Sequence, residues 1–187
     1  KNEAEAVEWY RKAAEQSHAR AQYNLGMMLA IGRGADKNEA EAVEWYRKAA
    51  EQSHARAQYN LGMMLAKGSG VEKNEAEAVE WYEAVVWYRK AAEQNHAGAQ
   101  YNLGIMLANG RGADKNEAEA VGWYRKAAEQ NHGGAQSNLG IMLAEGRGAE
   151  KNEAEAVVWC RKAAGQGDAD AQHNLGMMLS NGSGVDK

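Results

Sequence analysis

The sequence is dominated by one helical segment that recurs five times at nearly constant spacing. The segment reads EAEAVEWYRKAAEQ at residues 39–52, and its copies begin at Glu3, Glu39, Glu75, Glu117 and Glu153. A period of this size is typical of repeat proteins, in which one unit cannot bury its apolar face alone and must stack on its neighbours. The repeat therefore constrains the architecture more than any single residue does.

The copies divide the chain into successive units with one irregularity. The period predicts a single repeat domain over residues 1–187, with units 1–36, 37–72, 73–114, 115–150 and 151–186. The third unit is longer than the others because it carries a six-residue insertion. The first two units are nearly identical, so the copies are expected to share one structure.

Each unit opens with a predicted amphipathic helix, which we name the Trp-Tyr helix. In the second unit, Asn38 is a good N-cap, and Glu41 follows three residues later, as in a capping box. Glu44 is expected to form exposed ion pairs with Arg47 and Lys48. The helical spacing predicts an inward stripe of Ala42, Val43, Trp45 or Tyr46, Ala49 and Ala50.

A second predicted helix follows in each unit, and we name it the Leu-Gly helix. Its copies are expected at residues 19–30, 55–66, 97–108, 133–144 and 169–180, with a core in the first copy of Ala21, Leu25, Gly26, Met28 and Leu29. A glycine in mid-helix costs about 1 kcal/mol relative to alanine. We therefore expect Gly26 to mark a close approach by a neighbouring tryptophan or helix backbone. Gly32 and Gly34 let the chain turn back with positive φ.

Two stretches together resemble a known repeat family. AQYNLGMMLAIGRG at residues 21–34 and EAVEWYRKAA at residues 41–50 are similar to the Sel1-like repeat family, which is related to tetratricopeptide repeats. The resemblance covers essentially the whole chain. It implies an all-α fold, a right-handed α-solenoid of stacked helix-turn-helix repeats, with a concave face lined mainly by the Leu-Gly helices. It also implies adaptor or scaffold work through protein–protein interaction.

Composition narrows the classes of function. The formal net charge is -4, from 22 basic and 26 acidic residues spread along the chain, which argues against a nucleic-acid-binding surface. No apolar run approaches the ~20 residues that a membrane span needs. The single cysteine, Cys160, excludes an internal disulfide framework and a zinc site built on paired cysteines. We expect Cys160 to be a small buried apolar residue.

No catalytic, cofactor or metal site is predicted. The histidines His18, His54, His96 and His132 recur in the turn before each Leu-Gly helix, too far apart to share a metal ion with ligand distances of ~2 Å. The glutamates are expected on solvated helix surface. An alternative is a hydrolase like the cysteine-rich Sel1-like relatives linked to penicillin binding. Those relatives carry a disulfide in each repeat, whereas this chain lacks the cysteines.

The concave face is the candidate binding face for a protein or peptide, at positions of the Leu-Gly helices that are expected to point into the groove. The predicted partner-binding residues are Arg20, Tyr23, Met27, Arg56, Tyr59, Met63, Lys67, Tyr101, Asn109 and His173. One interpretation is drift at solvent-exposed positions. The other is a polarised groove for an extended or helical peptide, in which tyrosines serve as rigid anchors and Arg20 and Arg56 hold an acidic group.

The insertion in the third unit copies the Trp-Tyr segment, giving EAVEWYEAVVWYRKAA. Val85, Val86, Trp87 and Tyr88 are expected to keep the standard register, because they precede the intact RKAA. Trp81 and Tyr82 should then lie on an added extension and be partly exposed. They are either a tolerated duplication or an exposed anchor for a partner.

The ends of the array offer a further contact. The first unit keeps the full Trp9-Tyr10 stripe, although terminal repeats normally carry a polar outer face. Either flanking sequence covers these ends or molecules associate end to end.

Overall fold

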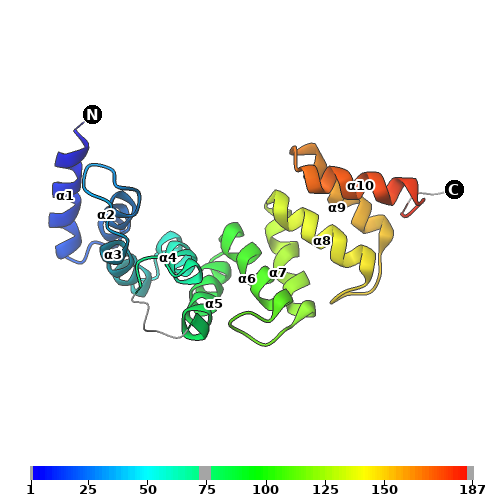
Figure 1. The fold of residues 1–187 in the computed structure, drawn as a ribbon, viewed down its shortest axis with the longest axis horizontal. Coiled ribbons are helices and arrows are strands. Elements are labelled where there is room, and N and C mark those ends of the chain that lie inside the picture. Colours follow the sequence, from blue (N-terminus) through cyan, green and yellow to red (C-terminus); the bar gives the residue numbers. More distant parts are fainter. Residues whose placement is uncertain (1, 72–76, 185–187) are drawn as a thin grey trace. The chain divides into compact units, whose positions relative to one another are not determined.

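The computed structural model describes residues 2–71 and 77–184 and contains ten α-helices and no strand within those ranges (Figure 1). This confirms the predicted all-α solenoid class. The Trp-Tyr helices are α1 (Glu3–Glu15), α3 (Glu39–Glu51), α5 (Glu77–Glu93), α7 (Glu117–Glu129) and α9 (Glu153–Gly165). The Leu-Gly helices are α2 (Ala19–Ile31), α4 (Ala55–Lys67), α6 (Ala97–Asn109), α8 (Gly133–Glu145) and α10 (Ala169–Ser180).

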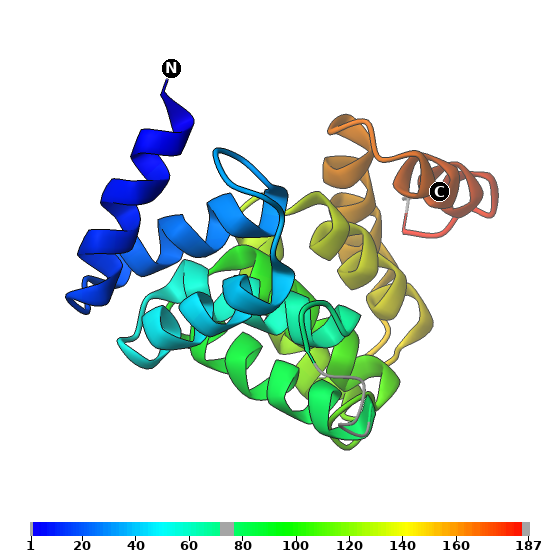
Figure 2. The ribbon, with the colours of Figure 1, turned by 60° about the vertical axis from the view of Figure 1, so that its left-hand side comes forward.

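The chain forms two compact units, residues 1–94 and 95–187. The first unit contains α1 to α5 and the second contains α6 to α10. Within each unit, helices adjacent in sequence pack side by side (Figure 2), and the most extensive contact joins a Leu-Gly helix to the Trp-Tyr helix that follows it. A single domain over residues 1–187 stays a prediction.

The Leu-Gly helices end one residue later than predicted in four of the five copies. In α2 the last residue is Ile31, because the chain leaves the helix only at Gly32, which caps it in the left-handed conformation with φ 69°. Gly34 also has positive φ, at 75°, as expected for the turn. The fifth copy ends at Ser180, as predicted.

The Trp-Tyr helix buries the predicted stripe. In α3 the buried side chains are Ala42, Val43, Trp45, Tyr46, Ala49 and Ala50, so both aromatic residues face inward. The side chain of Asn38 accepts a hydrogen bond from the Glu41 N–H at 3.1 Å, which confirms the N-cap. The capping box is only half formed, because the Asn38 N–H donates to the Leu29 carbonyl at 3.0 Å and not to the Glu41 carboxylate.

The Glu41 carboxylate is used to join two repeats. It accepts from Arg11 Nη1 at 2.6 Å, from the preceding Trp-Tyr helix, and from Trp45 Nε1 at 3.2 Å. The hydrogen bond from Arg11 lowers the pKa of Glu41 most, and that from Trp45 lowers it further. Glu41, which the sequence suggested was a solvated surface residue, therefore links two neighbouring Trp-Tyr helices.

The ion pairs expected within the Trp-Tyr helix are replaced by contacts of another kind. Arg47 forms its ion pair with Glu83 of the next Trp-Tyr helix and not with Glu44; its Nη2 lies 3.2 Å from Glu83 Oε2. Lys48 lies over the Trp45 ring, with Nζ 4.1 Å from the centroid. Packing between helices supplied the partner of Arg47, whereas the contact of Lys48 with Trp45 follows from the three-residue spacing within α3.

Gly26 is a point of close approach, as predicted, but its neighbour is a tyrosine and not a tryptophan. A Cβ at Gly26 would lie 2.9 Å from Tyr46 Cδ1 and 3.2 Å from the Ala42 carbonyl oxygen. The same arrangement joins Gly62 to Tyr88 and Gly104 to Tyr124. The absence of a side chain at the glycine therefore makes room for the tyrosine ring.

Cys160 takes the place of the tyrosine in the last pair of helices. Its side chain is fully buried, and its Sγ lies against Gly140 of the preceding Leu-Gly helix. Burial raises the pKa of the Cys160 thiol. The prediction of a small buried apolar residue is confirmed.

The insertion keeps the predicted register. Helix α5 is 17 residues long, against 13 for α3. Val85, Trp87 and Tyr88 are buried and Val86 is half-buried. Tyr82 is 64% exposed, whereas Trp81 is half-buried. The second Trp-Tyr copy therefore packs in the repeat. With Trp87 in the place of Trp45, the extra residues of α5 are 77–80, so Trp81 and Tyr82 lie at the places of Glu39 and Ala40 and not on the extension itself.

A buried glutamine was not foreseen from the sequence. Gln22 is 3% exposed, its Nε2 donates to the Ala14 carbonyl at 3.1 Å, and its Oε1 accepts from Gln52 Nε2 at 2.7 Å. The side chain thus caps one helix end and links to the next repeat. The corresponding pairs are Gln58 with Gln94, Gln100 with Gln130, and Gln136 with Gln166.

Candidate functional site

Each of the two compact units, residues 1–94 and 95–187, presents a stacked tyrosine and histidine on its Leu-Gly helices. The rings of Tyr23 and His54 lie 4.8 Å apart at 24°, and those of Tyr101 and His132 lie 4.5 Å apart at 30°. The tyrosine comes from one Leu-Gly helix, and the histidine precedes the next one. Each stack therefore joins two successive repeats within its unit.

The histidine is fixed by a second role, which sequence reasoning missed. His54 is the N-cap of α4, and its Nδ1 accepts from the Ala57 N–H at 3.2 Å; His132 does the same for Ala135 at 3.3 Å. A histidine whose Nδ1 accepts is neutral and carries its proton on Nε2. The spacing of three residues to a first-turn alanine was the available signal, because it is the N-cap spacing.

Burial acts on these histidines in the same direction. It lowers the pKa of His54 and of His132, because the charged ring would lose water. The positive charges of Arg56 and Arg20 lower the pKa of His54 further. The neutral tautomer required for capping is therefore the favoured state.

In the first unit, the stack borders a cavity of about 320 Å³. Its lining residues are Arg20, Tyr23, Asn24, His54, Ala55 and Arg56. Three predicted binding residues, Arg20, Tyr23 and Arg56, thus come together. The lining contains two guanidinium groups and no carboxylate, so the cavity is positively charged.

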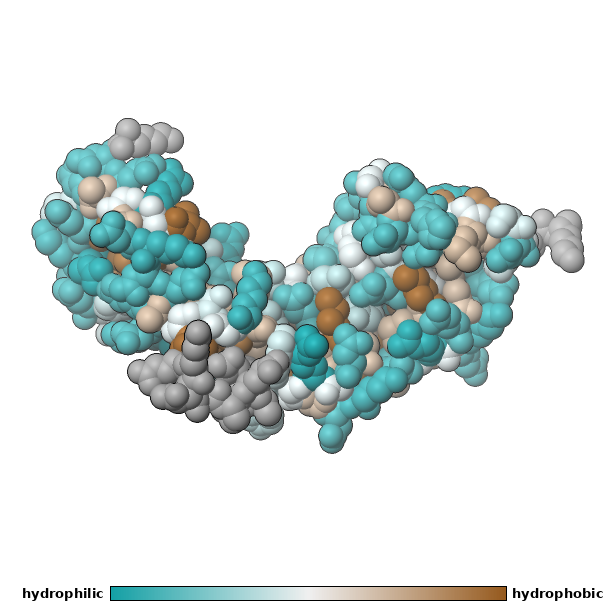
Figure 3. All heavy atoms as spheres, in the orientation of Figure 1, coloured by the Kyte–Doolittle hydropathy of each residue, from teal (hydrophilic) through white to brown (hydrophobic). Residues whose placement is uncertain are grey.

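Two cavities in the second compact unit are lined by apolar residues together with one charged side chain, Arg147 in the first and Glu145 in the second. The first cavity, of about 380 Å³, includes Ile105, Tyr124 and Ile141 in its lining. The predicted residue Asn109 also lines it. The second cavity, of about 320 Å³, includes Ile141 and Met177. On the face drawn in Figure 3, apolar residues likewise form separate patches within a mostly hydrophilic surface.

The remaining predicted residues lie outside these three cavities. Tyr59 is half-buried, with its ring 6.0 Å from that of Tyr88. Tyr101 is half-buried in its stack with His132. Met27 and Met63 are half-buried, whereas Lys67 and His173 are exposed. The structure therefore gathers part of the predicted face and leaves the rest as separate positions.

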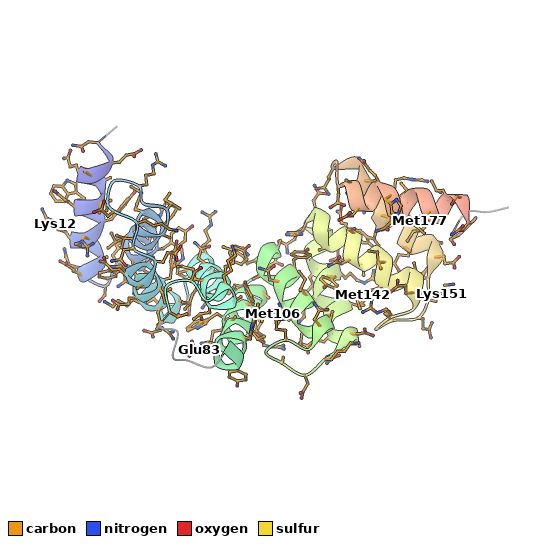
Figure 4. All side chains as sticks on the ribbon, viewed as in Figure 1. Lys12, Glu83, Met106, Met142, Lys151 and Met177 are labelled. Carbon is orange, nitrogen blue, oxygen red and sulfur yellow. The ribbon has the colours of Figure 1, made fainter. Side chains whose placement is uncertain are left out.

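The two ends of the array differ from the interior in exposure. Trp9 is 61% exposed, whereas Trp45 is 7% exposed. On α10, Met177, labelled in Figure 4, is 51% exposed, whereas the equivalent Ile141 on α8 is half-buried; Leu179 is 40% exposed, against 2% for the equivalent Leu143. A Cβ added at Gly176 would meet no atom within 4 Å. Among the described residues, no side chain packs on Gly176 as Tyr46 packs on Gly26.

Two general properties bear on the kind of site. Within residues 2–71 and 77–184, no three His, Cys, Asp or Glu side chains gather to hold a metal ion. The helices in those ranges are also too short or too polar to cross a membrane.

Comparison with known proteins identifies the repeats. The model of the Sel1 repeat matches residues 1–18, 19–54, 55–84, 83–96, 97–132, 134–168 and 169–187. A search of curated proteins finds no match.

Solved structures agree with the family model. A protective antigen of uropathogenic Escherichia coli strains is 39% identical with a TM-score of 0.88, covering 96% of this chain and 37% of its own. A Sel1 repeat protein from Oxalobacter formigenes is 38% identical with a TM-score of 0.81, covering 98% of this chain and 71% of its own. Cysteine rich protein B of Helicobacter pylori is 27% identical with a TM-score of 0.56, covering 74% and 96%.

This chain thus spans little more than a third of the Escherichia coli antigen. Sel1 repeat proteins are generally protein-interaction scaffolds, and the fold is typically non-catalytic. The repeats, the helical architecture and the similar structures lead to one conclusion: the chain belongs to the Sel1 repeat family.

Proposed function

We propose that the chain is a non-enzymatic scaffold that binds a peptide or protein on the outward face of its Leu-Gly helices. The observation that supports this most is the repeated tyrosine held against neighbouring rings. Tyr23 lies between His54 and Tyr46, and Tyr101 lies between His132 and Tyr124, with ring centroids 4.5 to 6.1 Å apart.

These tyrosines have the properties of binding anchors. Each of Tyr23, Tyr59 and Tyr101 is half-buried, so part of its ring packs on the scaffold while part remains accessible. A ring already held in place loses little conformational entropy when a ligand binds. Tyrosine also combines apolar area with a hydrogen-bonding hydroxyl, and it is enriched among residues that dominate interface energies.

The test is selection of peptides on the immobilised chain from a display library. Affinities of the selected peptides are then measured by calorimetry for wild type and for the triple variant Tyr23→Ala, Tyr59→Ala, Tyr101→Ala. We expect binding at least about tenfold weaker in the variant, because truncating a hot-spot residue costs more than about 1 kcal/mol. Circular dichroism checks that the variant is folded.

A matched control uses an aromatic residue outside this face. Tyr82→Ala removes a ring that is 64% exposed near the start of α5, and it should leave affinity unchanged. Equal binding by wild type and the triple variant would refute the proposal. Loss of binding in Tyr82→Ala alone would move the anchor to Trp81 and Tyr82.

End-to-end self-association is a second candidate, favoured by Gly176, on which no described side chain packs. In interior repeats, this glycine position faces a tyrosine or Cys160 of the following helix. Tyr10 of a second copy could pack on Gly176, since α1 is a Trp-Tyr helix. Sedimentation equilibrium should then show mass rising with concentration, and Gly176→Leu should abolish the rise. A constant monomer mass would remove this candidate.

A further inference from the structure

Two arginines in the first unit stand apart from most others. Arg20 and Arg56 are exposed, line the same cavity, and form no ion pair with a described carboxylate. Five other arginines pair with glutamates of another helix or its start, either in the next repeat or in the same one: Arg11, Arg33, Arg47, Arg125 and Arg147. Most arginines join the scaffold, whereas these two leave their guanidinium groups available.

The histidine between them adds a donor. Because His54 Nδ1 accepts the Ala57 N–H, the ring must carry its proton on Nε2, which leaves an N–H donor. Stacking on Tyr23 fixes the plane of the ring. The cavity therefore combines two guanidinium groups with an oriented imidazole N–H.

The charges act at short range on one another. Arg20 and Arg56 line the same cavity as His54, and their positive charges contribute to lowering the pKa of its ring. Two uncompensated cations in one cavity of a chain with net charge -4 favour an anionic ligand group. The planar fork of a guanidinium matches a carboxylate or a phosphate in geometry.

The second unit shows the same scaffold without the cations. The stack of Tyr101 on His132 corresponds to that of Tyr23 on His54, but Gly98 and Gly134 stand where the first unit has Arg20 and Arg56. The stack is therefore independent of the arginines. The two arginines therefore change the charge of the Leu-Gly face in the first compact unit and leave its packing unchanged.

We infer that Arg20, His54 and Arg56 form a binding site for an oxyanion, a carboxylate or a phosphate, carried by a peptide that lies on the Leu-Gly face. This inference rests on the proposed peptide binding and specifies its chemistry. Arg20 and Arg56 supply charge and forked donors, and His54 supplies a directed neutral donor. Tyr23 forms the wall against which the neighbouring part of the peptide packs.

The test is an NMR titration of the whole chain with four probes. These are a blocked tetraglutamate peptide, a blocked tetraglutamine peptide, a blocked glycine peptide with one phosphoserine, and inorganic phosphate. We expect an anionic peptide to shift the His54 ring signals and tetraglutamine to shift none. Tetraglutamate binding assigns the site to carboxylates, and binding of the phosphoserine peptide or phosphate assigns it to phosphates. If no anionic probe binds, the inference is wrong.

Variants locate the binding. Arg20→Gln with Arg56→Gln should weaken the anionic probe at least about tenfold, the loss of one charge-assisted contact or more. Arg161→Gln removes an exposed charge on α9 and should have no effect. The reciprocal variant, Gly98→Arg with Gly134→Arg, should create a second site that shifts the His132 signals.

Replacement of Gly134 by arginine is sterically feasible. A Cβ at Gly134 would lie 3.0 Å from Tyr101 Cζ, so the ring must move by a few tenths of an ångström. Arg56 already stands at the equivalent place beside Tyr23. Unchanged affinity in the Arg20→Gln, Arg56→Gln variant would overturn the inference. Selected peptides that need the tyrosines but not these arginines would leave the proposed function standing.

Discussion

The two compact units present the same scaffold with different surface chemistry. Tyr23 stacks on His54 in the first unit as Tyr101 stacks on His132 in the second, and both histidines cap a helix through Nδ1. The first stack borders a cavity with two arginines. The second has glycines at the equivalent positions, and its unit has cavities that include Ile105, Ile141 and Met177.

The difference separates residues that build the repeat from residues that are free to vary. Stacking and glutamine pairing depend on contacts between helices, and capping depends on contacts within a helix start, so all three recur in both compact units. Charge on the outward face depends on no such contact, and it changes from Arg20 and Arg56 to Asp170 along the chain. Ligand selectivity on this fold is therefore expected at the outward positions.

The largest predicted effect tests whether the two scaffolds are equivalent. Gln58→Leu and Gln136→Leu each remove a buried amide that donates to a helix-end carbonyl at 3.1 Å. Each should lower the free energy of unfolding by about 1–3 kcal/mol, because a buried carbonyl loses its partner. Denaturant unfolding measures the loss.

Gln172→Leu is the matched control, since Gln172 makes the same kind of bond at 3.2 Å but is exposed. Water can replace that bond, so the loss should be small. A loss in one unit only would show that the scaffolds are not equivalent.

A smaller effect separates the units at their mid-helix glycines. A Cβ at Gly104 would lie 2.6 Å from the Tyr124 ring, against 3.0 Å for Gly62 and Tyr88. Gly104→Ala should therefore cost about 1 kcal/mol net, since overpacking exceeds the gain in helix propensity. Gly62→Ala should cost less.

Gly176→Ala serves as the control, because its Cβ meets nothing within 4 Å. It should raise the free energy of unfolding by up to about 1 kcal/mol through helix propensity alone. Equal losses at Gly62, Gly104 and Gly176 would contradict the close-approach explanation.

The smallest effect is the pH dependence of the histidine caps. His54 and His132 have lowered pKa values in the folded chain, so the neutral cap stabilises the fold fully above the unfolded pKa near 6.5. This stability is lost as the pH falls through the lowered folded pKa. The variant His132→Asp copies the Asp168 cap of α10. An aspartate cap stays charged at these pH values, so the variant should not lose stability as the pH falls from 7 through the pKa of the histidine.

The caps also distinguish the units. Arg20→Gln with Arg56→Gln should raise the pKa of His54 and leave that of His132 unchanged, because only His54 has arginines nearby. NMR titration of the ring protons measures both. The accompanying change in stability should stay under about 1 kcal/mol, the scale of one N-cap. Parallel shifts of both histidines would contradict the local origin of the effect.

Much of the fold could be predicted because the determinants are local. The N-cap at Asn38, the buried stripe from Ala42 to Ala50 and the positive φ of Gly32 follow from helix periodicity and backbone sterics. The register of Trp87 and Tyr88 followed from the intact RKAA after them. Repetition strengthened each of these inferences, since one helix was seen five times.

The candidate site was only partly predictable because its contacts join different helices. The sequence marked Arg20, Tyr23 and Arg56 as groove-facing residues, but it could not show that they share a cavity with His54. It also suggested Glu44 as the partner of Arg47, whereas packing supplied Glu83. Spacing within one helix does not determine which side chains meet across two.

The sequence by itself determined the repeat, the helix type and ends, and the stripe that each helix buries, because these depend on near neighbours in the chain. Tertiary structure alone decided that Gln22 is a buried link, that Tyr46 and not Trp45 faces Gly26, and that His54 shares a cavity with two arginines. These outcomes depend on the partner that each side chain finds when helices far apart in sequence pack together. Polar groups such as Gln22 are buried only where that partner satisfies their hydrogen bonds.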